Sequence, residues 1–257
     1  MLILLSPAKT LDYDTPVWTD VRTQPRLTDE ATVLAERLKK KSAGQLRKLM
    51  SLSKDLAALN YERYQEWRYP FDESQARPAL FAFKGDVYLG LGLHDHFEEE
   101  DVLYAQDHLR ILSGLYGVLR PLDDMMPYRL EMGTKLKVGR PNNLYEYWGT
   151  KIAELLNEDL SEQQGKVVVN LASGEYWKAV DQKVLDAEVI TPEFKDWKNG
   201  QFKVLSFFAK KARGMMAKYL VTQRIDSFDG LQNFEEEGYS FNPELSAPNR
   251  PVFTRKQ

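Results

Sequence analysis

Two segments of the sequence concentrate positive charge and contain no carboxylate, a pattern typical of phosphate-binding surfaces. The first runs from Arg37 to Lys54 and the second from Trp197 to Ile225, and each holds seven lysines and arginines. The whole chain is slightly acidic, with a formal net charge of -3, so a uniformly basic nucleic-acid binder is excluded. A polyanion would have to bind local patches such as these, named here the first and second basic islands. An ordinary solvated face is the alternative interpretation of each.

Residues 49–57 of the first basic island resemble the turn of a DNA-binding helix–hairpin–helix unit. Such turns follow the order hydrophobic-x-Gly-hydrophobic-Gly and direct backbone amides at a phosphate, beside the start of the second helix. The sequence LMSLSKDLA keeps the hydrophobic and alanine positions but places Ser51 and Ser53 where glycines are expected. Serine resists a positive φ angle, although its hydroxyl can bind a phosphate oxygen. We predict DNA contacts from Lys48, Ser51, Ser53 and Lys54, with a helix corner that only packs as the alternative.

The second basic island contains a segment of helical periodicity at residues 209–225. Apolar side chains gather on one side of this predicted helix and basic side chains on the other. Lys210, Lys211 and Arg213 belong to the basic side, and we expect them to contact phosphates. One hypothesis is that both islands line a single cleft for DNA.

Most familiar catalytic signatures are absent from the sequence. There is no Walker A loop, no G-x-G-x-x-G, no G-x-S-x-G and no H-E-x-x-H. None of the three histidines has a glutamate three positions before it, and HDHFEEED at 94–101 is more simply explained as a solvated acidic loop. We therefore expect no metal site and no cofactor, and direct iron chelation is the weakest function considered.

The composition indicates a folded protein, because 43% of the residues are hydrophobic and 12% are aromatic. Cysteine is absent, which excludes disulfides, thiolate catalysis and peroxide sensing at a thiol. No apolar run reaches the roughly 20 residues that span a bilayer, and the initial apolar stretch is too short for a signal peptide. We expect a cytoplasmic protein with no membrane contact.

The apolar pattern predicts a mixed α/β fold, similar to α+β folds and without a regular strand–helix repeat. We expect one domain over 1–257, with a helical hairpin insert at about 28–67 whose helices are capped by Thr28, Ser42 and Ser53. Strands are expected at 2–6, at 79–91 with a turn at Gly85, at 166–173, and within AEVITPEF and FKVLSFFA. Further helices are expected at 144–160, at 209–225, and from 99 to a break at Gly114 or Gly117.

Seven segments spread over the chain match, in order, the motifs of one protein family. They are LILLSPAKTLD (2–12), AFKGDVY (82–88), LRILSGLYGVLRPLD (109–123), PYRLEMG (127–133), NLASGEYWKAV (170–180), SFFAKKARGMMAKYL (206–220) and EGYSF (237–241). On these motifs the chain resembles the YaaA family of bacterial peroxide stress response proteins. The resemblance implies a single mixed α/β body of unusual topology that binds DNA through a basic cleft and a helix–hairpin–helix element. It also implies a cytoplasmic protein that limits oxidative damage by keeping intracellular iron low, with no established enzymatic reaction.

The resemblance also singles out polar residues within these motifs. By this argument Arg110 and Arg120 join the expected DNA contacts. Several other motif residues follow predicted strands, where α/β proteins build their sites. We predict that Lys9, Lys84, Arg129 and Lys211 converge on a phosphate-containing ligand, with Asp86 and Glu131 available for acid–base chemistry. The alternative is that Arg129–Glu131 and Lys84–Asp86 are structural ion pairs.

Two functions therefore stand side by side. The first is a non-enzymatic protein that binds duplex DNA by its shape or damage rather than its sequence. The second is an enzyme that acts on nucleotides or nucleic-acid bases through the strand-end residues. A deep cavity that holds Asp86 or Glu131 with a lysine favours the second, and a shallow open groove favours the first.

Overall fold

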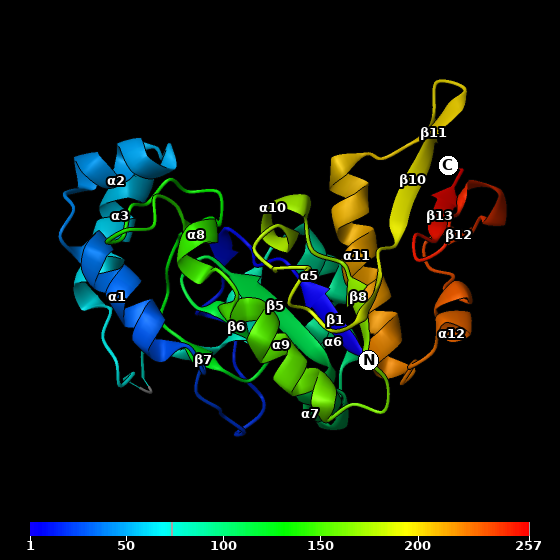
Figure 1. The fold of residues 1–257 in the computed structure, drawn as a ribbon, viewed down its shortest axis with the longest axis horizontal. Coiled ribbons are helices and arrows are strands. Elements are labelled where there is room, and N and C mark those ends of the chain that lie inside the picture. Colours follow the sequence, from blue (N-terminus) through cyan, green and yellow to red (C-terminus); the bar gives the residue numbers. More distant parts are fainter. Residues whose placement is uncertain (73, 257) are drawn as a thin grey trace.

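A five-stranded sheet forms the centre of the molecule, and the first strand of the chain lies in its middle (Figure 1). All four residues of this strand are buried, as the apolar sequence LILL predicts. The computed structural model describes residues 1–72 and 74–256 and confirms the mixed α/β fold. The strands, in sheet order, are β6 (Gly117–Leu119), β5 (Leu109–Ser113), β1 (Leu2–Leu5), β8 (Val167–Asn170) and β9 (Glu188–Ile190).

The strand order reverses beside β1. Strand β1 pairs in parallel with β5 on one side and with β8 on the other, so the chain builds outward from β1 in both directions. Strand β9 continues the parallel sheet, and β6 adds an antiparallel edge. In such sheets the crevice at the carboxyl ends of the two strands that flank the reversal is the usual ligand site. Here that crevice lies where β1 and β8 end.

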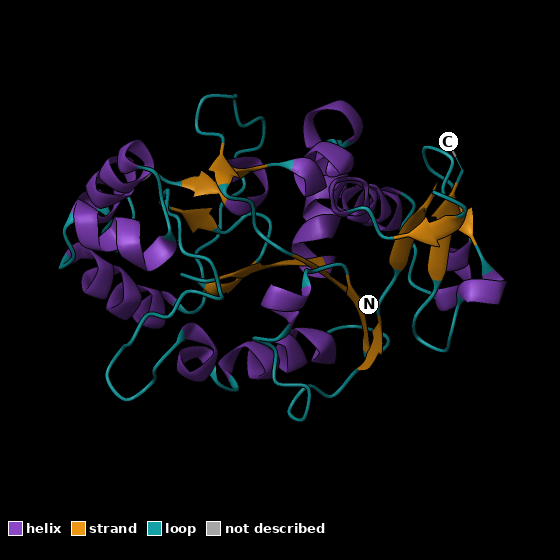
Figure 2. Ribbon diagram, turned by 90° about the horizontal axis from the view of Figure 1, so that it is seen from above, coloured by secondary structure: helices purple, strands orange, loops and turns teal. Residues whose placement is uncertain are grey.

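Helices cover both faces of this sheet (Figure 2). Helix α7 packs against β1 and β5, and α9 packs against β6. Among the described residues, no helix is both long enough and apolar enough to cross a membrane. The described helices outside the hairpin are α4 (Ala79–Ala82), α5 (Asp86–Leu91), α6 (Leu93–His96), α7 (Glu99–His108), α8 (Leu144–Trp148), α9 (Lys151–Ser161), α10 (Gly174–Trp177), α11 (Ser206–Thr222) and α12 (Phe228–Gln232), the last of which lies beside the second sheet.

A second sheet and a helical hairpin occupy opposite ends of the long axis (Figure 1). The second sheet has the order β11-β10-β13-β12 and packs against α11. Its strands are β10 (Glu193–Lys198), β11 (Gln201–Lys203), β12 (Ser240–Phe241) and β13 (Val252–Arg255), with a 3-10 helix at Pro243–Leu245. Two short ladders pair β2 (Thr10–Leu11) with β4 (Phe83–Lys84) and β3 (Arg77–Pro78) with β7 (Asp124–Met125).

The helical hairpin contains α1 (Thr28–Lys39), α2 (Ala43–Met50) and α3 (Lys54–Glu66). Ser42 and Gln45 form a reciprocal capping box at α2, and the Ser53 hydroxyl accepts the Leu56 amide at α3, so both predicted caps are confirmed. The cap predicted at Thr28 is wrong, because Thr28 is already helical and Leu27 precedes it without a side-chain cap.

Four predicted elements are wrong in whole or in part. Residues 79–91 form a helix, a two-residue strand and a second helix rather than a long strand. The helix predicted from 99 ends at His108, where the buried strand β5 begins, because the periodicity of a run as short as LRILS suits either structure. The helix predicted at 144–160 is divided by Gly149, whose φ of 50° only glycine adopts easily. The segment FKVLSFFA likewise begins in β11 but enters α11 at Ser206.

Helices α5 and α11 cross at two glycines that leave no room for a side chain. A Cβ atom on Gly214 would lie 1.8 Å from the Val87 carbonyl oxygen, and one on Gly90 would lie 2.0 Å from the Lys211 carbonyl oxygen. The two backbones therefore touch, and neither can give way as a flexible side chain would. This contact fixes the start of α5 against the middle of α11.

We expect Gly214→Ala to destabilise the protein by about 2 kcal/mol or more, because the added methyl group overpacks a rigid backbone contact. In thermal denaturation followed by circular dichroism, the midpoint should fall by about 5 °C or more. The matched control is Gly44→Ala, which also replaces a helical glycine. There the added Cβ atom has only the Ser42 hydroxyl nearby, 3.9 Å away. A Gly214→Ala midpoint equal to that of the wild type would contradict the proposed contact.

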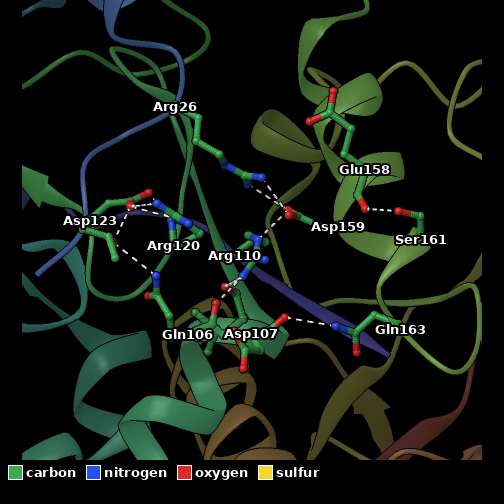
Figure 3. A network of polar contacts seen from close by, with 12 residues as sticks. Arg26, Gln106, Asp107, Arg110, Arg120, Asp123, Glu158, Asp159, Ser161 and Gln163 are labelled. Atoms are coloured by element: carbon green, nitrogen blue, oxygen red, sulfur yellow. Dashed lines mark hydrogen bonds and ion pairs between the residues drawn. The ribbon is translucent and has the colours of Figure 1, made fainter. Parts of the chain in front are cut away.

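A buried ionic network joins the sheet to α9 (Figure 3). Asp159 accepts two hydrogen bonds from Arg26, at 2.7 and 2.8 Å, and a third from the Nε of Arg110 at 2.6 Å. The Arg110 and Asp159 side chains are only 4% and 9% exposed. Burial would raise the pKa of Asp159, but the hydrogen bonds from Arg26 and Arg110 outweigh it and hold the pKa below its ordinary value.

We expect Asp159→Asn to cost about 3 kcal/mol or more, because it leaves two arginines without their shared counter-charge. Urea denaturation at neutral pH would measure this loss, and Asp186→Asn, which breaks an exposed pair with Lys166, should cost less than about 1 kcal/mol. Because the pKa of Asp159 is lower in the folded protein than its ordinary value of 3.8, its ionised form stabilises the folded state fully above pH 3.8. This stabilisation is lost as the pH falls below that value. Equal effects of the two substitutions would contradict a structural role for the network.

Candidate functional site

A cavity of about 480 Å³ opens at the carboxyl ends of β1 and β8, where the strand order reverses. Five parts of the chain meet there: the turn after β1, the junction of β4 and α5, the loop that holds Glu131, the segment after β8, and α11. We call it the strand-end cavity. Its charged and hydroxyl-bearing lining residues include Ser6, Lys9, Lys84, Asp86, Glu131, Ser173, Glu175, Tyr176, Lys210 and Arg213.

Short local contacts bring these segments together. The Ser6 hydroxyl accepts a hydrogen bond from the Ser173 amide at 2.9 Å, which ties the end of β1 to the turn after β8. The Tyr88 hydroxyl of α5 donates to the Ser6 carbonyl oxygen at 3.1 Å. The two-residue ladder of β2 and β4 sets Lys84 opposite Thr10. Sequence reasoning missed Ser6, although it is the polar last residue of the predicted first strand at 2–6.

The lysines of the strand-end cavity are paired with carboxylates, but one pair differs from the prediction. Lys9 lies 2.7 Å from Glu131, and Lys210 lies 3.9 Å from Asp86. Lys84 pairs with Asp12, at 3.1 Å, rather than with Asp86. A hydrogen bond from the Thr15 amide, with others from its hydroxyl and from Lys84, holds the pKa of Asp12 well below its ordinary value, so Asp12 is an anion.

Arg129 and Lys211 take different positions. Arg129 lies 3.5 Å from Glu131 and lines a smaller adjoining cavity that also includes Lys9 and Glu131. The predicted Arg129–Glu131 ion pair is therefore present. Lys211 instead bonds Glu237, with its ammonium 2.5 Å from the carboxylate, and is not among the residues that line the strand-end cavity. Three of the four predicted cations thus gather around Glu131 and the turn after β1, while the fourth faces the second sheet.

Arg213 is the exception to this pairing. It projects from α11 and lines the strand-end cavity, yet no carboxylate lies within ion-pair distance of it in the part of the chain that the structure describes. Its side chain is partly buried, and this burial lowers the pKa of Arg213. The site therefore holds one partly desolvated guanidinium with no counter-charge of its own.

The hairpin turn adopts the backbone that its serines were expected to resist. Ser51 has a φ of 53° and a ψ of 46°, the left-handed conformation that glycine usually supplies. The Ser53 hydroxyl already accepts the Leu56 amide, although its proton remains free to donate. Lys48 and Lys54 are exposed, and neither forms an ion pair with another described residue.

The two basic islands occupy different parts of the molecule. The first lies on the helical hairpin at one end of the long axis, and the second lies on β10, β11 and α11 across the central sheet (Figure 1). Within the second island, Lys210 and Arg213 face the strand-end cavity, whereas Lys211 and Lys218 bond carboxylates of Glu237 and Glu236.

Arg110 and Arg120 hold the fold together. Arg110 is buried and gives hydrogen bonds to Asp159 and to the Gln106 and Leu109 carbonyl oxygens (Figure 3). Arg120 bonds Asp123 at 2.8 Å and the carbonyl oxygen of Gln24. These contacts show that both arginines support the fold, and their predicted contact with DNA stays a prediction.

Comparison with known proteins places the chain within a family. The family model described as "Peroxide stress protein YaaA" matches residues 1–245. A UPF0246 protein of Hahella chejuensis is 53% identical over 255 residues and is covered over 99% of both chains. UPF0246 proteins of Idiomarina loihiensis and Saccharophagus degradans are 53% and 50% identical over 257 residues, covering 100% of this chain and 99% and 100% of theirs. The chain therefore belongs to the YaaA family of peroxide stress proteins.

Proposed function

We propose that this peroxide stress protein binds duplex DNA through its helical hairpin and thereby helps to limit iron-driven oxidative damage. The observation that carries the proposal is the surplus of positive charge on the hairpin. Lys40, Arg47, Lys48 and Lys54 are all exposed, and none forms an ion pair with another described residue. Because no described carboxylate pairs with these exposed cations, a polyanion is a fitting partner for this group.

The backbone of the turn supports the same proposal. The amides of Ser53 and Lys54 begin α3 and have no backbone acceptor among the described residues, as expected for the first turn of a helix. Helix α3 has 13 residues, so its positive end can favour an anion such as a phosphate. The nearby Asp55 opposes this field in part, which makes the lysines the larger contribution.

In the proposed complex, the hairpin contacts the phosphate backbone of the DNA. Lysine and amide contacts to phosphate position a protein on DNA but carry no sequence information. We therefore propose that the hairpin recognises duplex shape or damage. The second basic island contributes less than its sequence indicates, because Lys211 and Lys218 are paired within the protein.

We expect binding to a fluorescein-labelled duplex, measured by anisotropy, to weaken steeply as salt rises. The double substitution Lys48→Gln and Lys54→Gln should make the slope of log affinity against log salt concentration shallower, by the amount expected for about two lost phosphate contacts. It should not lower the thermal midpoint. The matched control is Lys183→Gln, which removes an exposed lysine away from the hairpin. Unchanged affinity of the double variant would remove the hairpin from the interface.

A second candidate function is an enzyme that acts on nucleotides or nucleic-acid bases. The observation that favours it is a cavity, rather than a flat surface, that holds two carboxylates beside lysines at the usual ligand position of an α/β sheet. Asp86 and Glu131 each lie within ion-pair distance of one lysine, so each can bind or release a proton next to a cation.

The enzyme hypothesis predicts turnover that depends on Glu131. Single-stranded and duplex DNA, and nucleoside monophosphates, are incubated with the protein, and the products are separated by liquid chromatography and mass spectrometry. Glu131→Gln should lower any turnover by about 100-fold, because it removes the ionisable group but keeps its size. Turnover that survives this substitution, or no new product from any of these substrates, would rule out this role for Glu131.

A further inference from the structure

A second cavity, of about 690 Å³, adjoins the strand-end cavity across the turn after β8. We call it the outer cavity. Successive residues at 170–174 face the two cavities in turn. Leu171 and Ser173 line the strand-end cavity, whereas Asn170, Ala172 and Gly174 line the outer cavity. A single extended strip of chain thus forms a partition with one face toward each.

Arg213 belongs to both cavities. In the strand-end cavity Lys9, Lys84 and Lys210 each have a carboxylate within 3.9 Å or less. In the outer cavity Arg250 lies 2.9 Å from Glu193. Among the described lysines and arginines that line the two cavities, Arg213 alone has no carboxylate within ion-pair distance.

The state of Arg213 points to a missing anion. Its guanidinium is partly withdrawn from water, which disfavours the charged form, yet an arginine does not lose its proton in a protein. A desolvated charge without a partner is costly, and a bound anion would remove that cost. A guanidinium also presents paired donors that match the oxygens of a phosphate. A single guanidinium without a carboxylate partner suits one phosphate group rather than a triphosphate.

The outer cavity supplies a surface for an apolar, planar group next to that phosphate. Trp177, Pro192, Phe194, Val204 and Ala209 form its apolar walls, and Val204 is 54% exposed. Amide and hydroxyl side chains lie among them, and they could read the edge of a planar ring. They are Asn170, Gln182, Thr191 and Asn249. Aromatic walls with a few amides are the usual means of holding a nucleic-acid base.

We propose that the two cavities together bind one nucleoside monophosphate unit, with its phosphate on Arg213 and its base in the outer cavity against Trp177. This inference rests on the second function proposed above, and it names the substrate class of that site. The unit is either a free nucleotide or a nucleotide within a single strand, since both present the same phosphate and base.

Calorimetry with the full chain tests the proposal in two arms. One arm titrates the four deoxynucleoside 5′-monophosphates, with the matching nucleosides and inorganic phosphate for comparison. The other arm titrates a short single-stranded oligonucleotide. The variants are Arg213→Gln and Trp177→Leu, and the control is Lys203→Gln, which removes an exposed charge from the same basic island outside both cavities. Thermal denaturation of each variant reports whether it is folded.

We expect the wild type to bind a nucleotide more tightly than its nucleoside or inorganic phosphate. Arg213→Gln should weaken this binding about tenfold or more, and Trp177→Leu about fivefold or more, with Lys203→Gln unchanged. If these two variants lose binding in the mononucleotide arm, the ligand is a free nucleotide. If they lose binding only in the oligonucleotide arm, the ligand is a nucleotide within a strand. If folded Arg213→Gln and Trp177→Leu bind in both arms as the wild type does, or if the wild type binds in neither, the inference is wrong. Duplex binding through the hairpin would then stand unaffected, because it depends on Lys48 and Lys54.

Discussion

The contact between α5 and α11 is the constraint on which the arrangement of the site depends. Gly90 and Gly214 let two helices that are more than 100 residues apart touch backbone to backbone. Helix α5 begins directly after Lys84 and Gly85, and Gly214 follows Arg213. The contact therefore holds the charged end of β4 and the basic face of α11 around the same cavity. Without it, the lysines near β1 and the cations of α11 would belong to separate surfaces.

The distribution of ion pairs separates charges that support the fold from charges that remain available. Asp159 with its two arginines, and Arg120 with Asp123, satisfy one another inside the protein. Three lysines of the second island, Lys210, Lys211 and Lys218, are likewise paired with acids that are close in space but distant in sequence. Lys40, Arg47, Lys48 and Lys54 of the hairpin, and Arg213, have no such acid among the described residues. Free charge, rather than total charge, distinguishes the two candidate binding regions.

Sequence reasoning succeeded where local chemistry decides the structure and failed where tertiary contacts do. The buried strands β1 and β8, the caps at Ser42 and Ser53, and the long helix α11 follow from apolar runs and capping residues alone. The segment 79–91 did not, and its second helix, α5, packs through a glycine contact with residues far along the chain that the local sequence does not show. For the same reason, sequence spacing could not show that Lys84 bonds Asp12, or that Lys211 bonds Glu237.

The hairpin and the strand-end cavity are mechanically connected even though they lie apart. The Tyr64 hydroxyl of α3 donates to the Arg129 carbonyl oxygen at 2.8 Å, and Trp67 at the end of α3 donates to the Tyr116 hydroxyl at 2.9 Å. Both rings are almost fully buried, so α3 is anchored in the core rather than hinged to it. Arg129 is two residues from Glu131, which bonds Lys9 in the cavity. A polyanion held by the hairpin would thus lie at a fixed distance from the cavity, so one nucleic-acid strand could engage both only at a defined separation.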